Sequence, residues 1–199
     1  MEIRDPDTHR GVHVDNNNQA HTFAVTESES NSAIENGNGY NINTGIIALT
    51  GTGTSAVFYM KNNESPINGE ADIVIDTIIV GINTRSATVT ENPMVTIVRN
   101  PTGGTVVSDA TAVDINSNAN FGSNNVLDSL IYKGADGKTL TGGTDHAIVQ
   151  GTEGRITLPD LYIDLPKGSS IGIEIDLNTS GGANVYAVVV CHRKDGSDA

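Results

Sequence analysis

Cysteine and aromatic residues are scarce in this sequence of 199 residues. The single cysteine, Cys191, cannot form an intrachain disulfide, so neither a disulfide-stapled scaffold nor a site of several thiolate ligands is available. Because Cys191 ends an apolar run over residues 185–191, we expect it to be a small buried hydrophobic residue and not a reactive thiol. Tryptophan is absent and aromatics make up 4% of the chain, which weighs against a sugar-binding groove built from stacked rings.

Basic residues are also few. The chain has 11 Lys and Arg against 24 Asp and Glu, which gives a formal net charge of −13. Such a surface repels a phosphate backbone, so neither nucleic acid nor an anionic membrane is an expected partner. Apolar runs are short, and none approaches the roughly 18 residues that could span a bilayer. The first residues, Met1-Glu2-Ile3-Arg4-Asp5, lack the basic and then apolar pattern of a signal peptide, so we expect a soluble protein made in a cytoplasm.

Residues 1–39 differ from the rest of the chain because polar runs such as Asn16-Asn17-Asn18 separate short apolar pieces. A segment of this kind buries too little apolar surface to order itself. Within it, residues 10–14 and 21–25 alternate with the two-residue period of an extended strand. We interpret the segment as an extended arm that becomes ordered against a partner or a neighbouring copy. A disordered tail, or an ordinary first hairpin of the domain, explains the same pattern.

From Tyr40 onward, short β-branched runs alternate with Gly, Asn, Asp and Pro, which is typical of a sandwich or barrel. Strands are predicted at residues 40–50, 55–61, 71–82, 94–99, 105–115, 126–132, 146–150, 155–158, 161–165, 170–177 and 184–192. No stretch sustains the 3.6-residue apolar period of a helix, so helix is expected to be minor. The sequence therefore predicts an all-β antiparallel sandwich over residues 40–199, preceded by the arm at residues 1–39.

Two predicted strands indicate which of their faces is buried. In Ile171-Gly172-Ile173-Glu174-Ile175-Asp176-Leu177, apolar residues occupy every second position, so one face meets a core and the other meets water. Glu174 and Asp176 then point outward together, as expected of a solvated face. In the run over residues 73–80 both faces are largely apolar, which indicates a central strand or one covered by another subunit.

Two glycine-rich motifs match the consensus sequences of catalytic or nucleotide-binding turns. Gly168-Ser169-Ser170-Ile171-Gly172 matches a nucleophile elbow, and Gly51-Thr52-Gly53-Thr54-Ser55-Ala56 matches a dinucleotide fingerprint. Both chemistries require a helix after the turn, whereas each motif here runs into a strand-like segment. We therefore expect a turn entering a strand at Ser170, and a hairpin loop at residues 51–54.

Residues with oxygen or nitrogen side-chain atoms occur twice at a spacing similar to that of metal-binding motifs. Asp114, Asn116, Asn118 and Asn120 follow the alternate spacing of a calcium loop, but its glycine and its bidentate glutamate are missing, so a polar surface loop is expected. Among His9, His13 and His21, no glutamate stands where a zinc protease needs one, and the segment does not read as helical. The sequence thus predicts no enzyme, no catalytic residue, no metal site and no cofactor.

One stretch resembles a known group of proteins. Asn43-Thr44-Gly45-Ile46-Ile47-Ala48-Leu49-Thr50, then Ala56-Val57-Phe58-Tyr59-Met60-Lys61-Asn62-Asn63-Glu64, then Asp72-Ile73-Val74-Ile75 resemble successive strands of structural proteins in tailed bacteriophages. Upstream, Val14-Asp15-Asn16-Asn17-Asn18 and Gly39-Tyr40-Asn41-Ile42 are similar to the polar lead-in found there. The likeness covers about residues 10 to 82, and these motifs imply a virion component without a reaction.

This resemblance implies proteins that coat or cement capsids, or that sit on the tail, usually folded as jelly-roll-like sandwiches and often trimeric. It predicts a capsid decoration protein on the capsid surface of a virion, with the major capsid protein and further copies of this chain as partners. The arm would dock by adding a strand to a neighbouring sheet. Its candidate docking residues are Arg10, Val12, Val14, His21 and Phe23.

The alternative is a tail-fibre or other tail-associated module that binds a receptor or a carbohydrate. Loops rich in Asn, Thr and Gly favour this second hypothesis.

Overall fold

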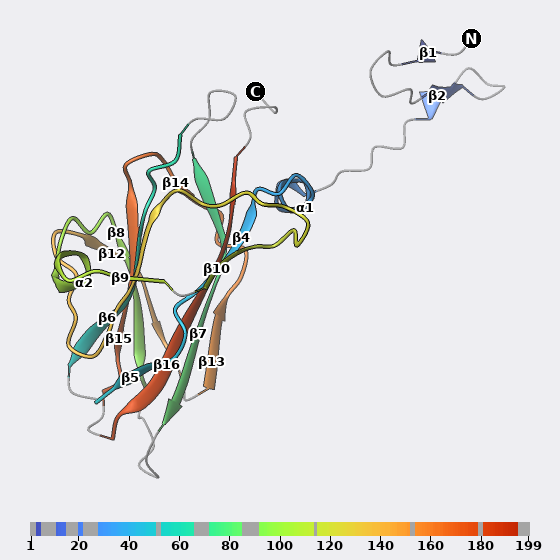
Figure 1. The fold of residues 1–199 in the computed structure, drawn as a ribbon. Helices are drawn as coiled ribbons and strands as arrows, with labels where there is room; N and C mark the ends of the chain where they lie inside the picture. The colour runs from blue at the N-terminus through green and yellow to red at the C-terminus, as the bar shows by residue number, and fades with distance from the viewer. Residues whose placement is uncertain are drawn as a thin grey trace.

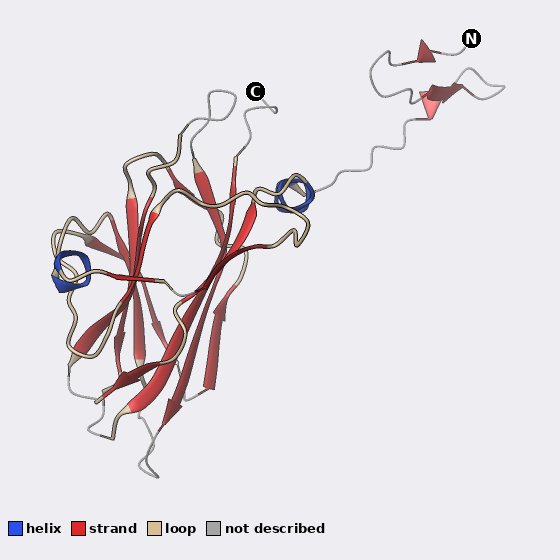
Figure 2. Cartoon of the chain, viewed as in Figure 1, coloured by secondary structure: helices blue, strands red, loops and turns tan. Residues whose placement is uncertain are grey.

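The computed structural model describes residues 28–50, 53–65, 72–84, 92–113, 115–151, 154–178 and 181–194, together with three short strands near the N-terminus. Most of these residues form two antiparallel β-sheets that face each other (Figures 1 and 2). The predicted all-β antiparallel sandwich is therefore confirmed.

The first sheet has seven strands. In spatial order they are β10 (Ile115–Asn118), β4 (Gly39–Asn43), β16 (Ala183–Arg193), β7 (Ile73–Thr84) and β13 (Gly154–Leu158), with β5 (Ile47–Leu49) on β16 and β14 (Ile163–Leu165) on β7.

The second sheet has six strands. Their order is β12 (Thr144–Gln150), β8 (Met94–Arg99), β15 (Ser170–Asp176), β6 (Thr54–Lys61), β11 (Leu130–Lys133) and β9 (Thr111–Ala112).

The chain passes repeatedly from one sheet to the other. Strands β4, β6, β7 and β8 alternate between the first and the second sheet, and β12, β13, β15 and β16 alternate again from the second sheet. The connection between Leu49 of β5 and Thr54 of β6 is one of these crossings, because β5 lies in the first sheet and β6 in the second. The predicted hairpin loop there is wrong, although a strand does follow the glycines, and Gly53 has the positive φ of 77° that a turn of this kind requires.

The core lies between the sheets and has the alternation that the sequence predicts. Ile171, Ile173 and Ile175 of β15 are buried in it, while Glu174 and Asp176 of the same strand are not fully buried. β15 pairs with β6 on one side and β8 on the other, so it is an interior strand of the second sheet, and its inward isoleucines pack in the core between the sheets. Cys191 is buried in the same core, as expected, and this burial raises the pKa of its thiol.

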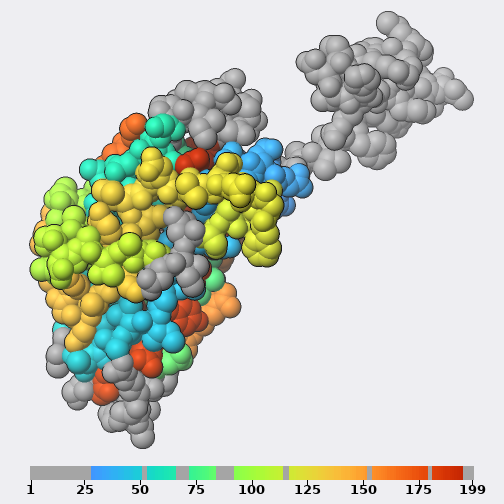
Figure 3. Space-filling view, in the orientation of Figure 1, coloured from blue at the N-terminus to red at the C-terminus, as the bar shows by residue number. Residues whose placement is uncertain are grey.

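Residues 100–143 connect β8 to β12, and we call them the insertion. They extend both sheets at one edge and cover the outer face of the second sheet. The insertion contains the short helix α2 (Thr105–Ser108) as well as β9, β10 and β11. In the space-filling view it runs along the visible face of the sandwich (Figure 3).

The strand predicted at residues 105–115 is wrong at its start. Val106 packs on Ala56 and Tyr59 outside the main core, so its apolar character reflects this contact and not a ladder position. Gly104, with a φ of 112°, turns the chain into the helix.

Helix α1 (Glu29–Glu35) lies within the segment that the sequence assigns to the arm. It begins at Ser28, whose hydroxyl accepts a hydrogen bond from the backbone N–H of Asn31 at 3.3 Å. It packs on β4 and β16, with Ala33 buried. The arm boundary predicted at residue 39 therefore differs from the structure, in which residues 28–38 are packed on the sandwich.

Three short strands precede this helix. They are β1 (Ile3–Arg4), β2 (Gly11–Val14) and β3 (Ala20–His21), and they form a small antiparallel sheet in that order. Of the predicted docking residues, Val12 and Val14 lie in β2 and His21 lies in β3. Arg10 and Phe23 lie outside the described residues. Docking through these five residues stays a prediction.

Candidate functional site

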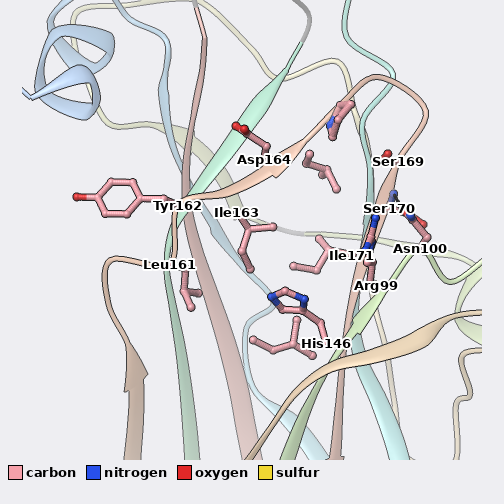
Figure 4. Close-up of a pocket in the computed structure, with 13 residues that line it drawn as sticks. Arg99, Asn100, His146, Leu161, Tyr162, Ile163, Asp164, Ser169, Ser170 and Ile171 are labelled. Carbon is pink, nitrogen blue, oxygen red and sulfur yellow. Dashed lines mark hydrogen bonds between the residues drawn. The ribbon is translucent and has the colours of Figure 1, made fainter.

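A pocket of about 400 Å³ opens at the edge of the sandwich where β8 and β12 of one sheet approach β14 of the other (Figure 4). Its apolar wall consists of Ile97, Leu161, Ile163, Leu165 and Ile171. Its polar rim consists of Arg99, Asn100, His146, Tyr162, Asp164, Ser169 and Ser170.

A β-bulge places His146 at this pocket. In the β12–β8 ladder, Asp145 pairs with Val98 and Ala147 pairs with Ile97, so His146 is an extra residue without a partner in the ladder. A bulge changes the direction of a side chain, and bulges are frequent near functional sites. Figure 4 shows the imidazole of His146 within the pocket.

The same pocket is lined by Ser170, His146 and Asp164. The hydroxyl of Ser170 and the carboxylate of Asp164 nevertheless interact with other groups and not with His146. The hydroxyl of Ser170 donates to the carbonyl of Pro101 at 2.7 Å. The carboxylate of Asp164 pairs with the ammonium of Lys194 at 2.8 Å. Ser170 also opens the strand β15, as the sequence predicts, so it does not stand on a turn between a strand and a helix. Within this pocket, the partners of Ser170 and Asp164 are therefore not those of a catalytic triad.

The asparagines with calcium-like spacing hold the insertion on helix α1. Asn118 donates from Nδ2 to the carbonyl of Gly37 at 2.7 Å, and Asn120 donates to the carbonyl of Glu35 at 2.9 Å. Asp114 lies outside the described residues. Within the described part of the chain, no group of three or more His, Cys, Asp or Glu side chains is placed to hold a metal ion.

A second polar cluster lies where α1 meets the outer face of the first sheet. His192 is 1% exposed, and its Nδ1 is 2.9 Å from the Oδ2 of Asp76 on β7. Its Nε2 is 3.7 Å from the Oε1 of Glu29, the first residue of α1. The hydroxyl of Ser30 donates to the same oxygen of Asp76 at 3.5 Å. The cluster thus attaches α1 to β7 and β16.

These neighbours control the ionisation of His192. Burial disfavours the charged imidazole and is the largest single effect, but the hydrogen bond and negative charge of Asp76 together with the contribution of Glu29 outweigh it. The pKa of His192 is therefore raised above its usual value. A protonated His192 donates from Nδ1 to Asp76 and turns its second N–H toward Glu29.

The protein should become less stable when the pH is high enough for His192 to lose this proton. A raised pKa in the folded state contributes stability that is complete below the unfolded value of about 6.5 and is lost as the pH rises through the folded value. We expect the unfolding midpoint of the wild type, relative to His192→Gln, to fall as the pH increases above about 6.5. Thermal unfolding at a series of pH values measures this, with His146→Gln, at an exposed position, as the matched control. Parallel curves for the wild type and His192→Gln would contradict the assignment.

A third cluster is buried at the end of β16. The guanidinium of Arg193 forms a hydrogen-bonded ion pair with Glu64, whose side chain is 2% exposed. Glu64 also accepts from the hydroxyl of Ser129 at 3.1 Å, and Arg193 donates to the carbonyl of Val126 at 2.9 Å. The guanidinium lies 5.6 Å from the ring centroid of Tyr40.

Sequence reasoning found neither of these clusters. It gave no catalytic role to His192, and it named neither Asp76 nor Glu64 as a functional residue. A usable signal existed at Asp76, because an acid within the apolar run of residues 73–80 requires a partner when the strand is buried. The identity of the partner, however, depends on how β7 and β16 pair.

The helices in the described ranges are short, and none combines the length and the apolar composition needed to cross a membrane.

Comparisons with known proteins add little to this description. No protein-family model matches the chain, and no curated protein matches its sequence. Among solved structures, the crystal structure of a Yersinia pseudotuberculosis-derived mitogen is similar, with 12% identity and a TM-score of 0.35. The match covers 80% of this chain and 91% of the mitogen chain. A likeness at this TM-score supports no argument about the function of this chain, and the resemblance to phage virion proteins stays a prediction.

Proposed function

We propose that the chain is a structural virion protein of a tailed bacteriophage, a capsid decoration protein that binds the outer shell and stabilises it. The main support is the position of helix α1. This helix packs on the first sheet of the sandwich and follows the polar N-terminal segment in the chain. Helix α1 is capped by Ser28 and fastened by the His192–Asp76 cluster, so the segment that precedes it starts from a defined place on the first sheet.

The strand order gives further support. Four consecutive strands of each sheet follow the orders β4-β16-β7-β13 and β6-β15-β8-β12. This is the order obtained when one long antiparallel hairpin is folded across two sheets, and we propose on this basis that the sandwich is a jelly roll, a fold used by viral capsid domains.

Attachment would combine the arm with contacts between copies. The arm supplies main-chain hydrogen bonds by adding a strand to a sheet edge of the major capsid protein or of a neighbouring copy. Several such contacts on a lattice raise the effective concentration of each subunit, so modest single affinities sum to firm attachment. A homotrimer fits this scheme, and measuring the mass of the protein in solution tests that part.

Deleting residues 1–27 tests the proposal directly. The deletion keeps Ser28 and α1, so the sandwich retains its cap and its polar cluster, and its unfolding midpoint should not change. Occupancy on purified shells that lack the protein should fall by about tenfold or more, because the arm contacts are lost. Unchanged occupancy by the deleted chain would reject the role of the arm, and absence of shell binding by the full chain would reject the function.

A further inference from the structure

Tyr186 lies on the outer face of the first sheet, on the side of β16 that points away from the core. Its partner across the ladder is Gly81 of β7. A Cβ atom at Gly81 would be 2.0 Å from the Cε1 of Tyr186 and 2.2 Å from its Cζ. The tyrosine ring therefore extends over the glycine backbone, where no other residue would leave room for it. Tyr186 is half-buried and lines a hollow, so part of its ring remains accessible.

A hollow of about 330 Å³ lies beside this ring. Its remaining lining residues come from neighbouring strands and one loop, and they are Asn43, Gly45, Ile46, Asn83 and Asn184. Asn83 and Asn184 are direct partners in the β7–β16 ladder. The side-chain oxygen of Asn43 accepts from the N–H of Gly45 at 2.8 Å, which fixes the orientation of that amide.

We propose that this hollow, the Tyr186 site, binds a neutral saccharide. An accessible aromatic ring suits the apolar C–H groups of a sugar, and the exposed carboxamide of Asn83 offers both a donor and an acceptor to sugar hydroxyls. The volume is at the low end of the roughly 300–1,000 Å³ of small-molecule pockets, which suits one or two sugar units.

The lining of the hollow favours a neutral ligand. None of the residues that line it is charged, so the hollow itself offers no ion pair to an anionic sugar or a phosphate, and the nearby cation, Arg155, is the ladder partner of Gly81 on β13. A purely apolar ligand would cover the exposed amide of Asn83 without offering it a hydrogen bond, which costs free energy. The scarcity of aromatics weighs against a groove of several stacked rings, but a site with one ring over a glycine needs only one aromatic residue.

The inference goes beyond shell attachment. It concerns a sheet face of the sandwich and does not involve residues 1–27, so either proposal can fail alone. A decoration protein with this site would bring the particle to glycan-bearing surfaces.

The test uses the full chain on an array of neutral oligosaccharides built from glucose, galactose, mannose and N-acetylglucosamine, with sialylated glycans as the anionic arm. Saturation-transfer NMR with the strongest binder should place Tyr186 at the contact. Tyr186→Ala should weaken binding by about tenfold or more, as expected of an aromatic anchor, whereas Tyr186→Phe keeps the ring face and should retain most of the affinity.

Three further variants separate binding from folding. Gly81→Ala displaces the ring and should weaken binding, and Asn83→Ala alters an exposed side chain at the rim and should also weaken it. Tyr162→Ala removes an exposed tyrosine outside the hollow and should leave binding unchanged.

Thermal unfolding of each variant shows whether it is folded. A silent array, binding of anionic glycans only, or equal binding by the wild type and a folded Tyr186→Ala or Asn83→Ala protein would overturn the proposal. In the last case the ring would serve only to cover Gly81.

Discussion

Replacing Glu64 with alanine should lower the free energy of unfolding by about 3–5 kcal/mol, because it leaves the charge of Arg193 without its partner in a largely buried place. The side chains of Arg193 and Glu64 are 14% and 2% exposed, so water cannot replace the lost carboxylate easily. The hydroxyl of Ser129 loses its acceptor in the same variant. For a chain of this size we expect the unfolding midpoint to fall by at least about 6 °C.

A double variant distinguishes the loss of a partner from the intrinsic contribution of the pair. Glu64→Leu with Arg193→Met removes both charges and should recover much of the stability, since an apolar pair of similar volume avoids the cost of burying two ions. Asp164→Ala breaks the more exposed pair with Lys194 and should cost less than about 1 kcal/mol. Urea unfolding measures all three. Equal stability of Glu64→Ala and Asp164→Ala would show that the buried pair is dispensable.

The buried strands of the sandwich could be predicted because their side chains alternate in the sequence. Residues 94–99 were predicted as a strand and form β8 with the same bounds, and the inward isoleucines of β15 follow the two-residue period. Such a pattern reports burial of one face, and burial of one face is a local property of a strand in a sandwich.

The insertion shows why other parts could not be predicted. Val106 and Val107 are β-branched and apolar, which favours a strand, but they cover the outer face of the second sheet from a helical turn. Only the tertiary contact with Tyr59 distinguishes the two outcomes. Helix α1 is seven residues long, too short for a periodic signal, and its main stabilising contacts are with β4 and β16.

The two candidate sites also depend on tertiary contacts that the sequence does not reveal. Asp76 and His192 are 116 residues apart in sequence, and they meet because β7 and β16 are adjacent strands. Tyr186 and Gly81 meet in the same ladder. Propensities and motifs do not contain that pairing, so both the polar cluster and the Tyr186 site become visible only with the register of the sheet.

The pairing of β11 with β6 depends on the glycine that follows β11. Gly134 follows β11, and its N–H donates to the carbonyl of Val57 at 2.9 Å. A Cβ atom at this position would be 1.7 Å from the carbonyl oxygen of Ala56 and 2.8 Å from the Cα of Val57. These are backbone atoms of a central strand, which cannot rotate away as a side chain can.

Gly134→Ala should therefore lower the free energy of unfolding by about 3 kcal/mol or more, because the chain must move away from β6 to avoid the overlap. The movement would break the hydrogen bond to Val57 and disturb the stacked rings of Tyr132 and Tyr59, whose centroids are 6.0 Å apart. Urea unfolding gives the free energy, and near-ultraviolet circular dichroism reports the tyrosine pair. Gly122→Ala is the matched control, since its Cβ would meet only the side-chain oxygen of Asn120 at 3.4 Å, and it should change stability by less than about 0.5 kcal/mol. If both alanine variants unfold at the same urea concentration as the wild type, then β11 is not held against β6 at this distance, and the insertion must pack on the sandwich in a different register.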